Sequence, residues 1–244
     1  MLAIIKAKYR GSSVPSGLFT EKKMSQKQIL IIAPHPDDEV LGCGGTIANL
    51  TKNGAAVFLC IVTQAYSPDW SGSFLEKRPH EVAAANKILG IKKTFFLNLP
   101  TVKLDTIPQK ELNHAIDNVI GQIKPEELYI PHPGDLNKDH RLVAEATLVA
   151  CRPGKQNIRR ILSYETLSET EWGQEIEPFI PNVYVDITDT FRFKLNAMKA
   201  YKSELKPFPH PRSLKTIKAL AQKRGSESGV KLAEAFKLIR ELTR

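Results

Sequence analysis

Two short polar stretches hold most of the residues that could carry out chemistry in this sequence. The first, HPDDE at positions 35–39, places a histidine, two aspartates and a glutamate directly after an apolar run. The second, PHPGDLNKDHR at positions 131–141, contains two further histidines, His132 and His140. Neutral imidazole nitrogens and carboxylate oxygens are ligands suited to zinc or ferrous iron. The two stretches together could therefore bind a divalent cation.

His35 and Asp38, which are three residues apart on a turn, could supply two ligands to such a cation. The third ligand must come from another loop, and His140 lies at the start of an expected helix. Two histidines and one carboxylate make up the three protein ligands that a catalytic zinc ion commonly keeps. Taken alone, the aspartate pair fits a helix cap equally well, because carboxylates favour helix N-termini.

The segments around these motifs alternate between strand-like and helix-like patterns. Apolar runs of strand length occur at 28–33 and 56–63, and a helix is expected between them at 44–54, ending at Gly54. Further strands are expected at 94–98, 127–130, 160–165 and 182–187, and further helices at 76–89, at 108–123, from about residue 139, and over most of 189–244. This alternation predicts an α/β protein with a mostly parallel sheet covered by helices on both faces.

In open sheets of this kind, ligands bind beyond the carboxyl ends of the strands. Both polar stretches directly follow an expected parallel strand, so they should meet at one edge of the sheet, which favours a metal site over a simple cap. A dinucleotide site is not expected at this edge. The sequence GCGG at 42–45 lacks the GxGxxG spacing, and the acidic groups beside it would repel a pyrophosphate.

The length of 244 residues and the hydrophobic content of 42% suit one large domain. We expect residues 1–23 to be a disordered N-terminal extension, because they are rich in Ser, Gly and Lys without a sustained period, and 24–244 to be a single domain. No apolar stretch reaches the roughly 18 residues of a membrane span, and no secretory signal is recognisable, so a cytoplasmic protein is expected. The three cysteines are never spaced as CxxC, which favours reduced, structural thiols.

The net charge of +9 is concentrated at the two ends of the chain. Residues 1–23 carry a charge of +4 and residues 191–244 a charge of +10. A basic tail can attract nucleic acid, an anionic membrane surface or a phosphorylated ligand, but it most often forms a solvated helix face. No nucleic-acid-binding motif accompanies the charge, so the expected partner is a small molecule and not a nucleic acid.

The motif PHPDDEVLGCGGT followed by DLNKDHR resembles the PIG-L/LmbE-like family of zinc-dependent de-N-acetylases. Weaker similarities are RxxE at 78–81 and AEAF at 233–236, which is similar to the family's C-terminal signature. The resemblance implies a Rossmann-like three-layer αβα sandwich with a helical C-terminal region. It also implies a Zn²⁺ cofactor, or Fe²⁺ or another divalent metal in its place. The implied activity is removal of the acetyl group from an N-acetylglucosamine-type glycoside, glycoconjugate or nucleotide-linked sugar.

By position, the resemblance implies His35, Asp38 and His140 as metal ligands. It implies Asp37 as the general base, which takes the proton of the attacking water and later protonates the amine. The family contains N-acyl sugar hydrolases, but the metal-binding residues do not recognise the sugar itself. A deacylase of another small N-acyl amine therefore stays open. So does a metal-dependent sugar- or phosphate-binding protein without turnover, although an intact Asp37 argues against it.

One position departs from the family pattern. Many members have HPDH where this chain has Asn137-Lys138-Asp139-His140, so the histidine thought to stabilise the intermediate is Asn137 here. An asparagine can donate a hydrogen bond but cannot shuttle a proton. His132 could compensate, or it could be a strand-end histidine in a turn fixed by prolines. Asp139 is expected to orient His140 or to cap its helix.

Two further residues are candidates for substrate contact. Arg78 could bind a sugar hydroxyl or a phosphate, or it could be a surface arginine near a helix start. Glu165 ends the expected strand at 160–165, where it could bind substrate hydroxyls or cap a turn.

Overall fold

The computed structural model describes residues 26–154 and 157–243. Its strands are β1 (Gln28–Ala33), β2 (Ala56–Gln64), β3 (Lys93–Pro100), β4 (Glu127–Pro131), β5 (Arg160–Tyr164), β6 (Val183–Asp186) and β7 (Ala233–Glu241). Its helices are α1 (Asp38–Lys52), α2 (Gly72–Leu89), α3 (Gln109–Ile123), α4 (Lys138–Ala150), α5 (Phe191–Ala200) and α6 (Leu214–Ser228). Two short 3-10 turns, η1 (Leu104–Thr106) and η2 (Thr170–Trp172), lie in the loops.

The seven strands form one sheet in the order β3-β2-β1-β4-β5-β7-β6. β1 pairs in parallel with β2 on one side and with β4 on the other, and β3 and β5 extend this parallel array. β7 is antiparallel to both of its neighbours, β5 and β6. The sheet is therefore mostly parallel, as the sequence predicts.

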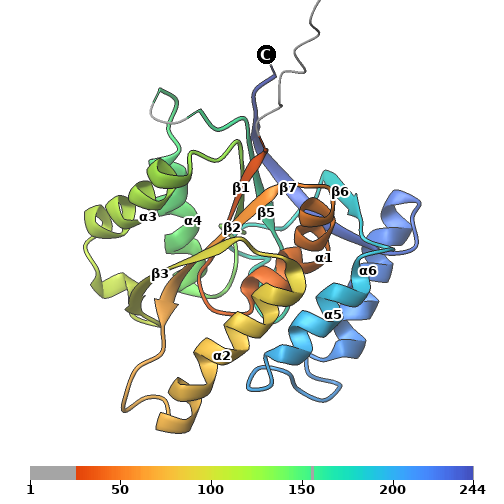
Figure 1. The fold of residues 1–244 in the computed structure, drawn as a ribbon, viewed down its shortest axis with the longest axis horizontal. Coiled ribbons are helices and arrows are strands. Elements are labelled where there is room, and N and C mark those ends of the chain that lie inside the picture. The colour runs from red at the N-terminus through yellow and green to blue at the C-terminus, as the bar shows by residue number, and fades with distance from the viewer. Residues whose placement is uncertain (1–25, 155–156, 244) are drawn as a thin grey trace, which may run out of the picture.

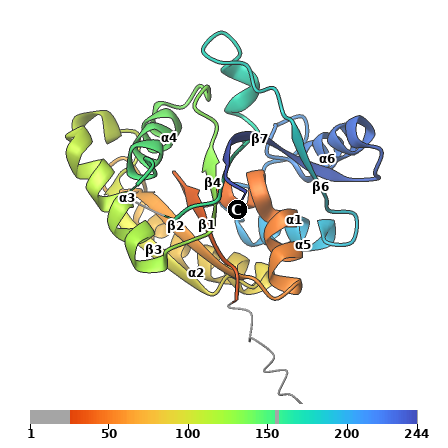
Figure 2. The same cartoon turned by 90° about the horizontal axis from the view of Figure 1, so that it is seen from above.

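Helices cover both faces of the sheet (Figures 1 and 2). Alternate residues of β1 enter opposite cores: Ile29 and Ile31 pack with α1, α2 and α5, whereas Leu30 and Ile32 pack with α3 and α4. A strand buried on both faces needs apolar residues at every position, which explains the continuous apolar run. The structure confirms the expected three-layer αβα sandwich.

Helix α1 begins at Asp38, six residues before the expected start at 44. The sequence pattern failed here because glycine is a poor helix former, and GCGG lies inside this helix. The glycines are needed for packing. A Cβ atom at Gly42 would collide with the ring of Tyr164, and a Cβ atom at Gly45 would lie 2.8 Å from the side chain of Ile187. The early start places Asp38 in the first turn of the helix.

The sequence analysis did not foresee β7, which lies in a region expected to be mainly helical. A short apolar run cannot be assigned to a strand or a helix by its period, and here pairing with two strands decides the structure. The expectation for residues 1–23 concerns a segment outside the described residues. Among the described helices, none has the length and apolar character needed to cross a membrane. The cysteines Cys43, Cys60 and Cys151 are buried and form no disulfide.

Candidate metal centre

The two polar motifs meet where the chain leaves β1 and β4. These two strands are neighbours in the sheet. The next strand in the chain after β1 is β2, on one side of the pair, and the next strand after β4 is β5, on the other side. In open α/β sheets, such a point of divergence leaves a crevice at the carboxyl ends of the strands. His35 follows β1, Asp38 begins α1, and His140 lies in the first turn of α4.

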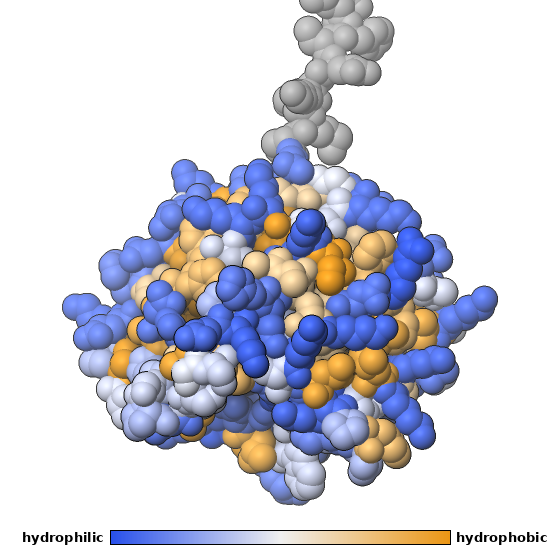
Figure 3. Space-filling view, turned by 60° about the horizontal axis from the view of Figure 1, so that its bottom comes forward, coloured by the Kyte–Doolittle hydropathy of each residue, from blue (hydrophilic) through white to orange (hydrophobic). Residues whose placement is uncertain are grey.

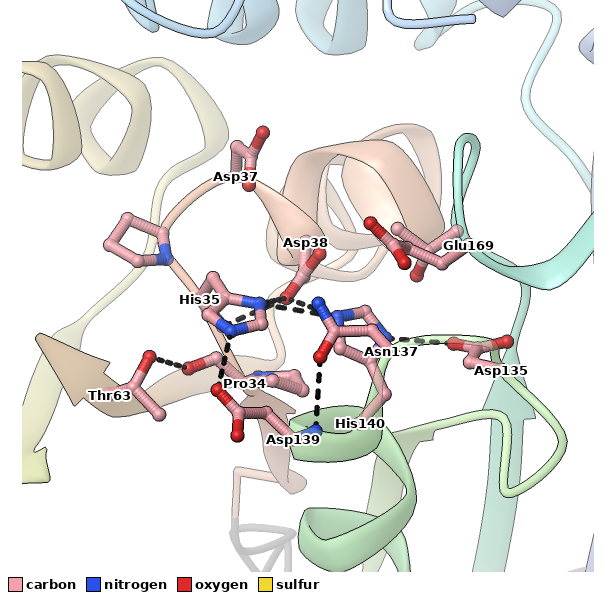
Figure 4. Close-up of polar contacts among 12 residues, drawn as sticks. Pro34, His35, Asp37, Asp38, Thr63, Asp135, Asn137, Asp139, His140 and Glu169 are labelled. Atoms are coloured by element: carbon pink, nitrogen blue, oxygen red, sulfur yellow. Dashed lines mark hydrogen bonds and ion pairs between the residues drawn. The ribbon is translucent and has the colours of Figure 1, made fainter. Parts of the chain in front are cut away.

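The structure brings His35, Asp38 and His140 together, with one ligand atom of each within 4.8 Å of the others (Figure 4). Asp38 Oδ2 lies 3.3 Å from His35 Nδ1 and 3.2 Å from His140 Nε2. Asp38 Oδ1 is buried and has no hydrogen-bond partner among the described residues. Burial alone would raise the pKa of Asp38, but the adjacent imidazoles of His140 and His35 hold it well below its usual range.

Two other carboxylates hold the histidines from behind. His140 Nδ1 donates to Asp135 Oδ2 at 2.8 Å, and His35 Nε2 donates to Asp139 Oδ2 at 3.1 Å. Once the rings lose the proton that faces Asp38, as metal binding requires, the protons on these outer nitrogens remain and the lone pairs of His35 Nδ1 and His140 Nε2 face Asp38. Two such lone pairs beside an ionised carboxylate with an unpartnered oxygen fit a divalent metal ion.

These contacts correct the expected role of Asp139. Its side chain orients His35 instead of His140, and it also accepts a hydrogen bond from the backbone N–H of Val102. The cap of α4 is Asn137, whose Oδ1 accepts from the N–H of Asp139. Sequence reasoning missed Asp135, which orients His140. Its presence in the same DLNKDH motif was the available signal.

The side chain of Asp37 points away from this cluster, in a different direction from that of Asp38 (Figure 4). Asp37 lines a cavity beside the cluster. It has a positive φ of 108°, which is uncommon for a residue with a side chain and turns the chain sharply before α1. The side chain is buried, and burial raises the pKa of Asp37 to about 8. Asp37 Oδ2 lies 3.3 Å from Arg212 Nη1.

Arg212 is a second residue that sequence reasoning missed. It lies 175 residues beyond Asp37, in the segment between α5 and α6, and no local pattern marks it. Its guanidinium group also pairs with Glu204 at 2.8 Å and with Glu169 at 3.4 Å. Arg212 therefore ties the C-terminal part of the chain to the loop that carries Asp37.

Arg78 has a related position on α2. Its guanidinium group donates to the carbonyl oxygen of Pro36 at 3.0 Å and to Ser203 Oγ at 3.0 Å. It also pairs with Glu204 at 2.9 Å, and its side chain is only 14% exposed. Arg78 lines the cavity, but its guanidinium group is engaged in these contacts. Through them it anchors the loop that contains His35 and Asp37.

The cavity has a volume of about 430 Å³ and is bounded by His35, Asp37, Arg78 and Asn137, among others. Of the residues predicted to act in catalysis or to bind substrate, His132 and Glu165 do not line it. His132 is buried below the surface, with Nε2 2.9 Å from the carbonyl oxygen of Glu177. Glu165 forms two hydrogen bonds with Arg224 of α6, at 2.8 and 2.6 Å.

Comparison with known proteins agrees with this geometry. Residues 30–151, half of the chain, match the family model "PIG-L: GlcNAc-PI de-N-acetylase". The chain is 34% identical over 187 residues to the uncharacterized deacetylase YaiS of Escherichia coli K12. The match covers 73% of this chain and 92% of that protein. It is 28% identical over 225 residues to the diacetylchitobiose deacetylase of Thermococcus kodakarensis. This match covers 87% of this chain and 83% of that protein.

Among solved structures, the conserved protein TT1542 from Thermus thermophilus superposes with a TM-score of 0.74 at 25% identity. The match covers 88% of this chain and 96% of that one. The family match includes both polar motifs, with all three residues of the His-Asp-His cluster. The chain therefore belongs to the PIG-L (LmbE-like) family of deacetylases.

Proposed function

We propose that the protein is a zinc-dependent amide hydrolase that removes the acetyl group from an N-acetylated sugar of the N-acetylglucosamine type. The observation that carries the proposal is the cluster of His35, Asp38 and His140 beside Asp37, which faces the cavity. Family membership supports the hydrolase activity. The relative named diacetylchitobiose deacetylase supports an acetylated sugar as the substrate class.

His35, Asp38 and His140 would hold the metal ion. A bound zinc ion supplies a Lewis acid that polarises the amide carbonyl and lowers the pKa of water. The donor set of two imidazoles and one carboxylate suits zinc and also ferrous iron. Asp135 and Asp139 fix the ring orientation of the two histidines, at 2.8 and 3.1 Å respectively.

Asp37 acts as the general base and then as the general acid. Its carboxylate takes a proton from the water that attacks the amide carbonyl. It then gives that proton to the nitrogen as the C–N bond breaks, which yields acetate and a free amine. Burial suits Asp37 to this work, because a carboxyl group with a raised pKa both accepts and releases a proton near neutral pH. Arg212 holds the carboxylate in place.

Asn137 is suited to stabilise the charge that develops on the carbonyl oxygen. Its Oδ1 accepts from the backbone of α4, which leaves the Nδ2 group as a donor at the wall of the cavity. A fixed donor of this kind stabilises an oxyanion without transferring a proton. Because His132 does not line the cavity, we assign this role to Asn137 alone.

The test separates metal binding from proton transfer at two adjacent residues. Asp38→Ala removes a ligand, so the purified protein should lose most of its zinc and its activity. Asp37→Ala leaves the three ligands in place, so zinc should stay near one ion per chain. Activity should fall about 10²- to 10⁴-fold, the usual contribution of a positioned acid or base. Elemental analysis and acetate release from N-acetylglucosamine derivatives measure the two effects.

Asp105→Ala is the matched control, because Asp105 is an exposed aspartate that pairs with Lys138 on the surface. It should leave both readouts unchanged. Loss of zinc in Asp37→Ala with retention in Asp38→Ala would reverse the two assignments. If neither variant changed the zinc content, the aspartates would be a helix cap and the proposed function would be wrong.

A further inference from the structure

One side of the cavity beside the metal centre is apolar. Its wall consists of side chains from the end of β2, the β2–α2 loop, α2 and β3: Ile61, Trp70, Phe74, Leu75, Val82 and Phe96. Ile61 and Val82 are buried at the base of this wall, whereas Phe96 is 49% exposed at its outer end. Figure 3 turns the face at the carboxyl ends of the parallel strands toward the viewer, and apolar side chains lie there among hydrophilic ones.

The size of this wall exceeds what the proposed reaction needs. An acetyl group brings one methyl group beside the carbonyl carbon, whereas six large apolar side chains line the cavity of about 430 Å³. Contiguous apolar surface of this kind usually marks a binding site, because exposing it to water is unfavourable.

The charged groups of the cavity are already paired with one another. Arg78 and Arg212 share Glu204, at 2.9 and 2.8 Å, and Arg212 also contacts Asp37. Binding a phosphate or carboxylate here would require breaking these ion pairs. The charge of the cavity therefore does not favour an anionic group on the substrate.

Uncharged polar side chains of the cavity remain available. Gln64, Asn98 and Thr101 line it, and within the described residues their side chains make no hydrogen bond. With the Nδ2 group of Asn137, they offer donors and acceptors for neutral hydroxyl groups. The cavity that Asp37 lines thus combines uncharged polar side chains with an apolar wall.

We propose that the substrate is amphiphilic: an N-acylated sugar that carries an alkyl or aromatic group, with the sugar hydroxyls on the uncharged polar side chains and the apolar group against α2. This inference rests on the proposed function and specifies its substrate class. The apolar group has two chemical sources, an acyl chain on the nitrogen longer than acetyl or an apolar aglycone at the anomeric carbon.

Two substrate series with the wild-type, metal-loaded protein distinguish these sources. In the first, methyl glycosides of glucosamine carry acetyl, butyryl, hexanoyl or octanoyl groups on nitrogen. In the second, N-acetylglucosamine carries a methyl, butyl, hexyl or octyl aglycone. In one series, kcat/KM should rise about threefold to fourfold per buried methylene until the cavity is filled. The series that rises identifies the source.

The chain contains two tryptophans, which provide a variant and its matched control. Trp70 lines the cavity, whereas Trp172 is 67% exposed on η2 and does not line it. Trp70→Ala should flatten the rising series, so that the ratio of kcat/KM between its longest and its shortest member falls toward one, because the lost contact is with the apolar group. Trp172→Ala should leave both series as in the wild type.

A binding measurement gives a readout that does not depend on turnover. In Trp172→Phe, Trp70 is the only tryptophan, so its fluorescence should change on titration with the long-chain member of the rising series and not with the methyl glycoside. If kcat/KM did not depend on chain length in either series while N-acetyl sugars were still hydrolysed, the inference of an amphiphilic substrate would be wrong and the proposed function would stand. Absence of hydrolysis of every N-acyl sugar by the zinc-loaded protein would overturn the proposed function instead.

Discussion

Asp135 should control the affinity of the metal centre although it is not one of the proposed ligands. It is fully buried, and its two carboxylate oxygens accept from His140 Nδ1 at 2.8 Å and from Thr170 Oγ1 at 2.6 Å. Asp135→Ala leaves His140 without its acceptor. The ring can then rotate or carry its proton on Nε2, and either change removes the lone pair that faces Asp38.

The expected magnitude follows from these contacts. Loss of an orienting partner typically costs about 10- to 100-fold in metal affinity, or about 1.4 to 2.7 kcal/mol. Asp135→Ala should lie near the upper end, because the site is buried and no water replaces the short hydrogen bond. Asp135→Asn should lie near 10-fold, since its carbonyl oxygen can still accept from His140 while its amide donates to Thr170.

Competition with a zinc chelator measures the dissociation constant of each variant, and circular dichroism establishes that each variant is folded. Asp105→Ala again serves as the exposed control and should bind zinc as tightly as the wild type. A folded Asp135→Ala protein with unchanged zinc affinity would refute the role of Asp135. It would show that packing alone holds the ring of His140.

Three further predictions concern the fold. Glu234→Ala leaves the buried ammonium group of Lys194 without its carboxylate, so urea denaturation should show a loss of about 3 to 5 kcal/mol in the free energy of unfolding. As the control, Glu227→Ala removes a more exposed carboxylate and should cost less than about 1 kcal/mol. Equal losses in the two variants would contradict the prediction. Gly42→Ala forces a methyl group into the aromatic ring packed on α1 and should lower the free energy of unfolding by at least about 1 to 3 kcal/mol in the same assay; an unchanged value would show that the ring moves aside. A chain that starts at Met24 should keep its thermal transition and its activity, and loss of either in calorimetry or turnover would show that residues 1–23 contribute to the fold.

The sequence was most informative where local pattern and tertiary structure agree. The continuous apolar run at 28–33 predicts a strand buried on both faces, and β1 occupies those residues. His35, Asp38 and His140 could be proposed as a set because each follows a strand end within a compact motif. His35 and Asp38 share one short segment, and His140 could be added to them because the carboxyl ends of parallel strands lie at one edge of a sheet.

Contacts of distant residues that do not follow an expected parallel strand could not be predicted. Nothing near Arg212 in the sequence indicates that its guanidinium group contacts Asp37, and nothing in AEAF indicates a strand. The structure gives this motif a physical role. Glu234 accepts hydrogen bonds from the N–H groups of Gly45 and Thr46, in the middle of α1, at 2.9 and 2.7 Å. The last strand thus fixes the helix whose first residue is Asp38.

The proposed metal ligands and the apolar wall of the cavity come from different parts of the chain. His35, Asp38 and His140 follow β1 and β4, whereas the apolar wall comes mainly from the β2–α2 segment at 61–82. In evolutionary terms, the two sets of residues can be selected separately. Substitutions within 61–82 can change which substrates fit while the residues that activate the amide bond stay the same. Exchanging the apolar residues of this segment between family members, with Arg78 retained as the anchor of the site loop, is therefore the engineering step that we expect to alter substrate preference.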